Sequence, residues 1–307
     1  MCTIGNSFYR VNGIDVQSVF KQCDLVDPTQ FLTPVVRSDN DIRYVAFTRI
    51  KNEDCPAWAG VNEYGVSFVA ADSYLKESKA DSGTTSVSGG KSVFDMYLSI
   101  ITSYKTAREA VIMAKKFYET EKYGEPLTDI LLISDEKEMY FIETVNGEVR
   151  IICRNNGHFV STNHCRMFYE AVPYDLNHST YLRLSRAEQI LHSRSDINGI
   201  GNLLRDSYYG KTIWSICRYP NLTEMDDNNH SEMQATEQKP DEDLYYTQAA
   251  VIFTVKHSSV SGEKPEIICE YVINNNASVE NAGYVWKPFQ DEAPVKVAYI
   301  GKSENII

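Results

Sequence analysis

The chain opens with MCTIGNSFYRVNGIDVQSVFKQCD (residues 1–24), in which two runs rich in apolar residues flank Asn12-Gly13. Asn-Gly between such runs is the strongest short-range signal for a β-hairpin, because both central residues of its turn need a positive φ. The pattern predicts one strand over residues 3–11 and a second over residues 16–25. The start of the chain is therefore predicted to be a hairpin within a β-sheet.

The rest of the sequence alternates between strand-like and helix-like periodicity. Strand patterns occur at 44–50, 66–73, 128–134, 138–145, 148–153, 213–217, 249–257 and 266–273, and helical patterns at 93–102, 106–121, 179–192 and 197–205. Hairpin connections, rather than strand–helix–strand crossovers, favour antiparallel sheets packed against helices. We therefore predict an α+β fold, a four-layer αββα sandwich of two antiparallel sheets between helical layers, in a single domain over residues 1–307.

Composition and charge exclude several classes of protein. Hydrophobic residues make up 43% of the chain and charged residues 23%, as in soluble globular proteins. No apolar run approaches the roughly 18 residues that a membrane-spanning helix needs, so we expect no membrane span. Forty-two acidic against thirty basic residues give a net charge of -12, which repels phosphate backbones and argues against nucleic acid as a partner.

Much of the acidic excess falls in one segment, residues 223–244, which holds eight carboxylates and the single cation Lys239. A segment with so few apolar residues and so many like charges is predicted to be a solvated, flexible insertion. We expect it to lie outside the catalytic core, while a role as a lid over the site stays open.

The seven cysteines are odd in number, widely spaced and without a Cys-x-x-Cys pair, which suits a reducing cytoplasm better than a disulfide framework. The first residues have neither the basic nor the apolar region of a signal peptide, so we expect a cytoplasmic protein that begins at or next to residue 1. His158, His164 and Cys165 match no familiar metal-binding loop, and no metal site is expected.

Cys2 directly follows the initiator methionine. Removal of Met1 would place a thiol and a free α-amino group on one residue, with reference pKa values of about 8.5 and about 7.7–8.0. The amine can accept the thiol proton, so this arrangement is a nucleophile beside its own base. The alternative is that residue 2 is an ordinary cysteine.

Four motifs occur in a set order along the chain. They are Cys2-Thr3, the Asp24 that ends the second predicted strand, Gly60-Val-Asn-Glu-Tyr-Gly65 and Ser161-Thr-Asn-His164. Together they resemble the N-terminal-nucleophile hydrolases, in the cysteine branch with choloylglycine (bile salt) hydrolase, acid-ceramidase-like amidases and the penicillin acyltransferase family. The resemblance extends in islands over residues 2–218. It implies cleavage of a small-molecule linear amide through an S-acyl-enzyme on the N-terminal cysteine, without a cofactor.

The resemblance also implies roles for residues of the first hairpin. Cys2 corresponds to the nucleophile of that branch, and Asp24 to the carboxylate that orients its α-amino group. Lys21 stands where the family has an arginine that binds substrate. Lysine keeps the charge but loses the planar fork of two parallel donors.

Further roles are implied for residues after the hairpin. Asp72 stands where bile salt hydrolases have an oxyanion-stabilising asparagine, and its carboxylate would repel an oxyanion, so either its backbone N–H donates or its carboxyl has another function. Asn163 is the expected side-chain oxyanion donor. Arg183 is the arginine expected at the site, with Arg186 as its alternative.

The sequence leaves other functions open. Ser215-Ile-Cys-Arg218 resembles the penicillin acyltransferase branch, which suggests aminoacyl or peptidyl transfer in small-molecule biosynthesis. The departures at Lys21 and Asp72 leave room for a non-catalytic binding protein on the same fold. Taken singly, Asp24 and Asn163 are ordinary turn residues. The oligomeric state stays open too, and a homo-oligomer is compatible with the sequence.

Overall fold

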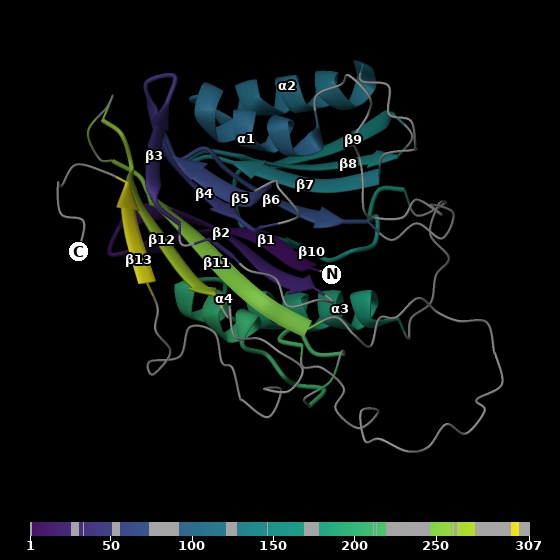
Figure 1. The fold of residues 1–307 in the computed structure, drawn as a ribbon. Helices are drawn as coiled ribbons and strands as arrows, with labels where there is room; N and C mark the ends of the chain where they lie inside the picture. The colour runs from purple at the N-terminus through teal and green to yellow at the C-terminus, as the bar shows by residue number, and fades with distance from the viewer. Residues whose placement is uncertain are drawn as a thin grey trace.

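The computed structural model describes residues 2–25, 31–32, 34–50, 56–73, 92–120, 128–145, 147–168, 178–210, 212, 214–218, 246–258, 260, 263–273 and 296–300. For residues 296–300 it describes the backbone alone. Met1 and the predicted insertion at 223–244 lie outside these residues. The described elements form four layers, in which two sheets lie between two pairs of helices (Figure 1).

One sheet has six antiparallel strands in the order β10-β1-β2-β11-β12-β13. Their bounds are β1 Cys2–Val11, β2 Ile14–Leu25, β10 His158–Ser161, β11 Tyr246–Lys256, β12 Glu266–Ile273 and β13 Lys296–Ile300. Strands from both ends of the chain therefore meet in this sheet, and β1 has a neighbour on each side.

The other sheet has seven antiparallel strands, β3 to β9, in sequence order. Their bounds are β3 Val36–Asp39, β4 Ile42–Thr48, β5 Ala57–Asn62, β6 Ser67–Asp72, β7 Thr128–Ser134, β8 Met139–Val145 and β9 Glu148–Arg154. Because each strand pairs with the next one along the chain, this sheet is a meander.

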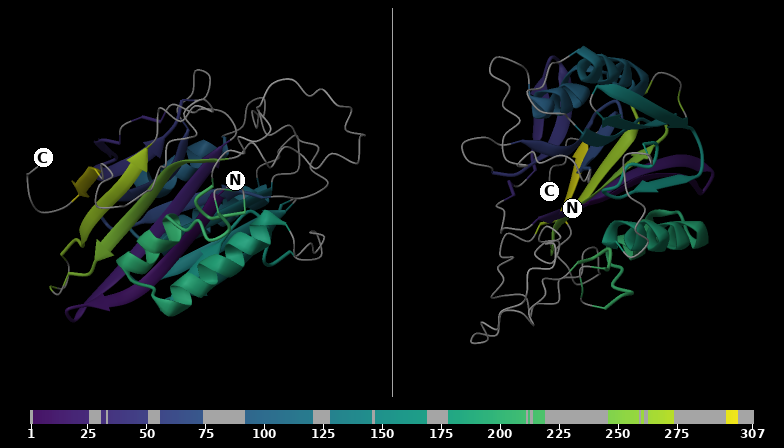
Figure 2. Two further views of the ribbon diagram at one scale, coloured as in Figure 1. Left: turned by 90° about the horizontal axis from the view of Figure 1, so that it is seen from below. Right: turned by 90° about the vertical axis from the view of Figure 1, so that its right-hand side faces the viewer.

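Two pairs of helices cover the outer faces of the sheets. Their bounds are α1 Val93–Ser103, α2 Ala107–Thr120, α3 Ser179–Ser193 and α4 Ile197–Leu204. The apolar faces of α1 and α2 pack on the seven-stranded sheet, and those of α3 and α4 on the six-stranded sheet. Viewed from the right-hand side of Figure 1, the two pairs lie on opposite sides of the sheets (Figure 2). The predicted αββα sandwich is confirmed.

The predicted N-terminal hairpin is present. Asn12 and Gly13 have φ values of 52° and 83°, as a turn of this type requires. β1 pairs with β2 along its full length, and at the open end of the hairpin Cys2 lies opposite Cys23. Since β10 and β11 flank the hairpin, Cys2 begins an interior strand of the sheet.

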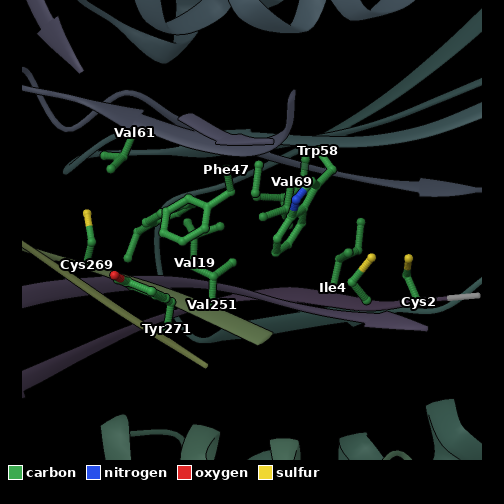
Figure 3. Packing of buried hydrophobic residues seen from close by; sticks show 14 of the residues in the cluster. Cys2, Ile4, Val19, Phe47, Trp58, Val61, Val69, Val251, Cys269 and Tyr271 are labelled. Atoms are coloured by element: carbon green, nitrogen blue, oxygen red, sulfur yellow. The ribbon is translucent and has the colours of Figure 1, made fainter. Parts of the chain in front are cut away.

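The largest apolar layer lies between the two sheets. It includes Ile4 and Val19 from the hairpin, and Phe47 and Trp58 from the facing sheet, whose rings meet edge to face at 5.7 Å (Figure 3). Strand residues alternate between faces, so on β2 Val19 faces this layer while Phe20 faces α3 and α4. The same alternation decides which side chains of β2 can reach Cys2.

The structure corrects one predicted strand. Residues 214–218 form turns and bends rather than the strand predicted over 213–217. The carbonyl of Ile216 accepts from the Gln22 side chain at 2.5 Å and the N–H of Arg218 from the Thr247 hydroxyl at 2.9 Å. Side chains of β2 and β11 thus bind the backbone groups that a strand would have paired.

The sequence pattern also fails to predict β3, β5, β10 and β13. β3 and β10 have only four residues each, and β5 is buried on both faces, so none of the three shows a clear alternation. None of the described helices is both long and apolar enough to cross a bilayer.

Candidate active site

Three residues from distant parts of the chain meet at one end of the sheets. Cys2 begins β1, Asn163 follows the end of β10, and Arg183 lies in α3. Their exposed fractions are 4%, 0% and 0%. We call these three residues the Cys2 cluster, because hydrogen bonds connect them directly. The Cys2 thiol lies at one end of the apolar layer between the sheets (Figure 3).

Asn163 is the centre of the Cys2 cluster. Its Oδ1 accepts hydrogen bonds from the backbone N–H of Cys2 at 2.8 Å and from Nη2 of Arg183 at 3.0 Å. Its Nδ2 donates to the backbone carbonyl of Asp72 at 2.8 Å. The amide orientation is therefore fixed by donors on one side and an acceptor on the other. One N–H of Nδ2 is used in this way, and an amide nitrogen carries two.

Arg183 binds the first two residues of β1, Cys2 through its backbone and Thr3 through its side chain. Its Nη1 donates to the Cys2 carbonyl at 2.8 Å and to the Thr3 hydroxyl at 3.1 Å. Arg186, one turn further along α3, instead pairs with Asp206 at 2.8 Å. Of the two arginines considered from the sequence, Arg183 is thus the one that contacts Cys2.

The first turn of α3 fixes the segment that carries Asn163. The hydroxyl of Thr180 accepts from the backbone N–H of Asn163 at 3.0 Å and contacts the Thr162 hydroxyl at 2.8 Å. It also lies 3.0 Å from Nδ1 of His164. Burial lowers the pKa of His164 to about 4, so this imidazole is neutral near pH 7. Arg183, and not His164, is therefore the positively charged side chain of the Cys2 cluster.

Lys21 reaches from β2 into the layer between the sheets. Its ammonium donates to the backbone carbonyls of Ala70 at 2.5 Å and Trp58 at 3.3 Å, and lies 5.2 Å from the centre of the Trp58 ring. The residue is only 4% exposed. A buried charge is costly unless it is hydrogen-bonded and compensated, and these contacts supply two acceptors and an aromatic face.

The Cys2 thiol lies in an environment that favours its charged form. A hydrogen bond from the Cys23 side chain lowers the pKa of Cys2, and the positive charge of Lys21 lowers it further. Burial and the negative charge of Asp72 act in the opposite direction. The net shift is downward, whereas burial alone would raise the pKa of a thiol.

Asp24 is buried one residue beyond Cys23, where the alternation of β2 turns its side chain toward the other face of the sheet. Its Oδ1 accepts from the Thr247 hydroxyl at 2.7 Å. That hydroxyl also accepts from Nε2 of Gln22 at 2.9 Å and from the backbone N–H of Arg218. Asp24 therefore anchors the junction of β2, β11 and residues 214–218, and its role toward the α-amino group stays a prediction.

Asp72 contributes its backbone to the Cys2 cluster through the bond from Asn163. Its side chain is exposed at the end of β6, where Asp72 pairs with Asp129 of β7. The negative charge of Asp72 raises the pKa of both Asp129 and Cys2. A group that raises the pKa of Cys2 acts against the thiolate, so the carboxylate is unsuited to stabilise an oxyanion beside it.

The Gly60–Gly65 motif lies away from the Cys2 cluster, at the end of β6 opposite Asp72. Here the Asn62 side chain donates to the carbonyls of Ile101 and Tyr104 at 3.1 and 2.8 Å, and Gly65 has a φ of 82°. The motif therefore connects the β5–β6 turn to the end of α1. It is part of the fold, and its place in the resemblance reflects architecture rather than chemistry.

The structure adds residues to the site that the sequence does not single out. Cys23 hydrogen-bonds to the Cys2 thiol, Thr180 fixes the Asn163 segment, and Thr247 binds Asp24. Cys23 lies next to Asp24, while Thr247 lies far from every motif, and each of the three acts through a partner distant in the chain. In the described part of the chain, no three potential metal ligands lie together.

No protein-family model matches the sequence, and no curated protein matches it. Solved structures do match. Two variants of the conjugated bile acid hydrolase from Clostridium perfringens are 11% identical to this chain, cover 99% of it and 99% of their own length, and give TM-scores of 0.45 and 0.47.

A Caenorhabditis elegans ortholog of N-acylethanolamine-hydrolyzing acid amidase is 13% identical, covers 82% of this chain and 92% of its own, and gives a TM-score of 0.45. The matches thus include a bile acid hydrolase, the kind of protein that the sequence motifs resemble. At these identities and TM-scores they carry no residue role and no substrate to this chain, whose chemistry rests on its own geometry.

Proposed function

We propose that the chain is a cysteine-dependent amide hydrolase of the N-terminal-nucleophile type, with Cys2 as its nucleophile. The observation that carries the proposal is the double anchoring of Cys2. Asn163 accepts from its N–H, Arg183 donates to its carbonyl, and its thiol lies in an environment that favours the thiolate. The backbone groups of any buried residue need partners, but here the partners are side chains of one cluster, which hold Cys2 in one orientation as a nucleophile requires.

Removal of Met1 is the activating step of the proposal. Cleavage of the Met1–Cys2 peptide bond converts the N–H of Cys2 into an amine, and Oδ1 of Asn163, 2.8 Å away, is already placed to hold it. An α-amine has a reference pKa of about 7.7–8.0, so it can take the thiol proton near neutral pH. The same group then returns a proton to the leaving amine.

The reaction proceeds through an acyl-enzyme. The Cys2 sulfur attacks the amide carbonyl carbon and a tetrahedral intermediate forms. The carbon–nitrogen bond then breaks as the leaving amine takes a proton from the α-amino group of Cys2. The second N–H of Asn163 Nδ2 is the proposed donor to the oxyanion, because Asp72 already binds the first. Water then hydrolyses the thioester.

Lys21 and Asp24 support the nucleophile in this proposal. Lys21 stabilises the thiolate by its charge, and its ammonium is held by two carbonyls of the facing sheet rather than extended toward substrate. Asp24 keeps the role of orienting the α-amino group. It fulfils that role through the position of the β2 end, which its bond to Thr247 fixes.

The proposal is tested by amine release from a panel of N-acyl amino acids, conjugated bile acids and N-acylethanolamines, with protein that begins at Cys2. We expect wild type to cleave at least one class and Cys2→Ala to lose at least about 10³-fold in kcat, the scale of removing a nucleophile. Cys153→Ala is the matched control, since Cys153 is an exposed cysteine on β9, and it should retain wild-type rates. Release that persists in Cys2→Ala, or wild-type release no faster than that variant on every amide, would contradict the proposal.

A further inference from the structure

A second thiol, that of Cys23, faces Cys2 across the hairpin. The two residues lie directly opposite each other in the register of β1 and β2, and both belong to the apolar layer between the sheets. Side chains opposite each other in an antiparallel pair have Cβ atoms about 4.5–5.5 Å apart, within reach of a sulfur–sulfur hydrogen bond. Both residues are buried, so bulk water does not compete for this contact.

Another buried cysteine shows how this layer affects a thiol with different neighbours. Cys269 belongs to the same layer and lies at its opposite end from Cys2 (Figure 3). Its partners across the strands are Phe253 and Ala298, and burial raises the pKa of its thiol. The pKa of Cys2 moves the other way, although Cys2 is buried in the same layer. The difference between the two sites is the set of groups around the sulfur.

Those groups favour the thiolate form of Cys2 over the thiolate form of Cys23. The Cys23 side chain hydrogen-bonds to Cys2 and lowers its pKa, while the same bond and burial raise the pKa of Cys23 well above its usual range. Of the charges nearby, Lys21 favours the thiolate, and Asp72 of the facing sheet opposes it. Arg49 lowers the pKa of Cys23, against the larger effect of the bond.

We propose that Cys23 is a catalytic residue, whose thiol proton hydrogen-bonds to the Cys2 sulfur and holds it as the thiolate before substrate arrives. The inference rests on the proposed function, in which Cys2 is the nucleophile. It assigns to Cys23 a part that neither the α-amine nor Lys21 supplies, a direct donor to the reacting atom. Charge-assisted hydrogen bonds of this kind are stronger than those between neutral groups.

The proton balance of the reaction is closed without a further group. In the resting enzyme the Cys2 proton is on the α-amine, which is therefore an ammonium, and Cys23 keeps its own proton. The thiolate forms the bond to the carbonyl carbon, the carbon–nitrogen bond breaks, and the ammonium gives its proton to the leaving amine. Water then attacks the thioester, the amine takes a proton from that water, and the thiolate returns to its bond with Cys23.

The test is a pH titration of the ultraviolet absorbance of thiolates, with the contribution of Cys2 taken as the difference from Cys2→Ala. We expect Cys23→Ala to raise the midpoint of Cys2 by about one pH unit, the size expected for loss of one hydrogen bond to a charged group. Cys23→Ser, which keeps a donor in nearly the same volume, should fall between that variant and wild type. The acidic limb of the kcat/KM profile should move by the same amounts.

Cys269→Ala is the matched control, because it removes a thiol from the same layer. It should leave the Cys2 midpoint unchanged, which separates a hydrogen bond from a general loss of packing. A wild-type midpoint in Cys23→Ala and Cys23→Ser would overturn the inference, and so would a low-pH thiolate that survives in Cys2→Ala. The titration uses no substrate, so its outcome is distinct from a failure of amide cleavage.

Discussion

The side chains of Asn163 and Arg183 determine where Cys2 lies, and they do so with backbone contacts rather than with the thiol. Arg183 binds two groups of β1 and the amide oxygen of Asn163 with two of its nitrogens. Such a spread of donors suits a planar guanidinium and cannot be reproduced by a single ammonium. The cluster is buried, so no water replaces a lost bond at low cost.

Arg183→Lys should therefore reduce catalysis more than it changes the fold. We expect the kcat for amide cleavage to fall at least about tenfold, because Cys2 and Asn163 lose their common donor. The Cys2 sulfur is then no longer held in position to attack the substrate carbonyl. KM should change less. The control is Arg186→Lys on the same helix, whose pair with Asp206 lies outside the Cys2 cluster. Equal kcat values for the two variants would show that Arg183 only stabilises the helix.

At the scale of elements, a buried carboxylate connects the helical layer to the seven-stranded sheet. Asp129 of β7 accepts hydrogen bonds from the hydroxyls of Tyr97 on α1 and Tyr118 on α2. Burial raises the pKa of Asp129 to about 6, even though both tyrosines favour the carboxylate. The two helices are thus held to the sheet by a group that titrates in the acidic range.

This arrangement predicts how stability depends on pH. The folded pKa is about 6 and the ordinary value 3.8, so the unfolded chain ionises first and stability falls as pH rises through that window. Lowering the pH from about 7 to about 5 should stabilise wild type relative to Asp129→Asn by roughly 1 kcal/mol, or about 2–4 °C in Tm. Tyr118→Phe, which removes a donor to the carboxylate, should enlarge the dependence. Parallel Tm curves for wild type and Asp129→Asn would contradict the account.

Elements set by local signals could be predicted from the sequence. The hairpin follows from Asn12-Gly13, and the long helices follow from their apolar periodicity. The elements that the sequence predicts wrongly depend on contacts between distant parts of the chain. Residues 213–217 are predicted as a strand because most of them are apolar, yet side chains of Gln22 and Thr247 bind the backbone groups of Ile216 and Arg218. Such contacts are decided by the assembled sheet, which sequence periodicity does not report.

For the whole molecule, the site forms where elements from separate parts of the chain end together. Cys2, Asn163 and Arg183 come from three segments, and Asp72 adds a backbone carbonyl from the facing sheet. Motif resemblance predicted these four residues, although it could not predict that Asp72 contributes its carbonyl instead of its side chain. Cys23 could not be found in this way, because its importance arises only from strand register.

The central claim is that Cys2, freed of Met1, carries the acyl group during turnover. The most direct measurement is mass spectrometry of the enzyme quenched in acid during cleavage of its best amide, followed by mapping of the peptides. We predict one added acyl group on a peptide that begins at Cys2, and none in Cys2→Ala. An acyl group on another cysteine, or an active enzyme that retains Met1 ahead of residue 2, would contradict the account.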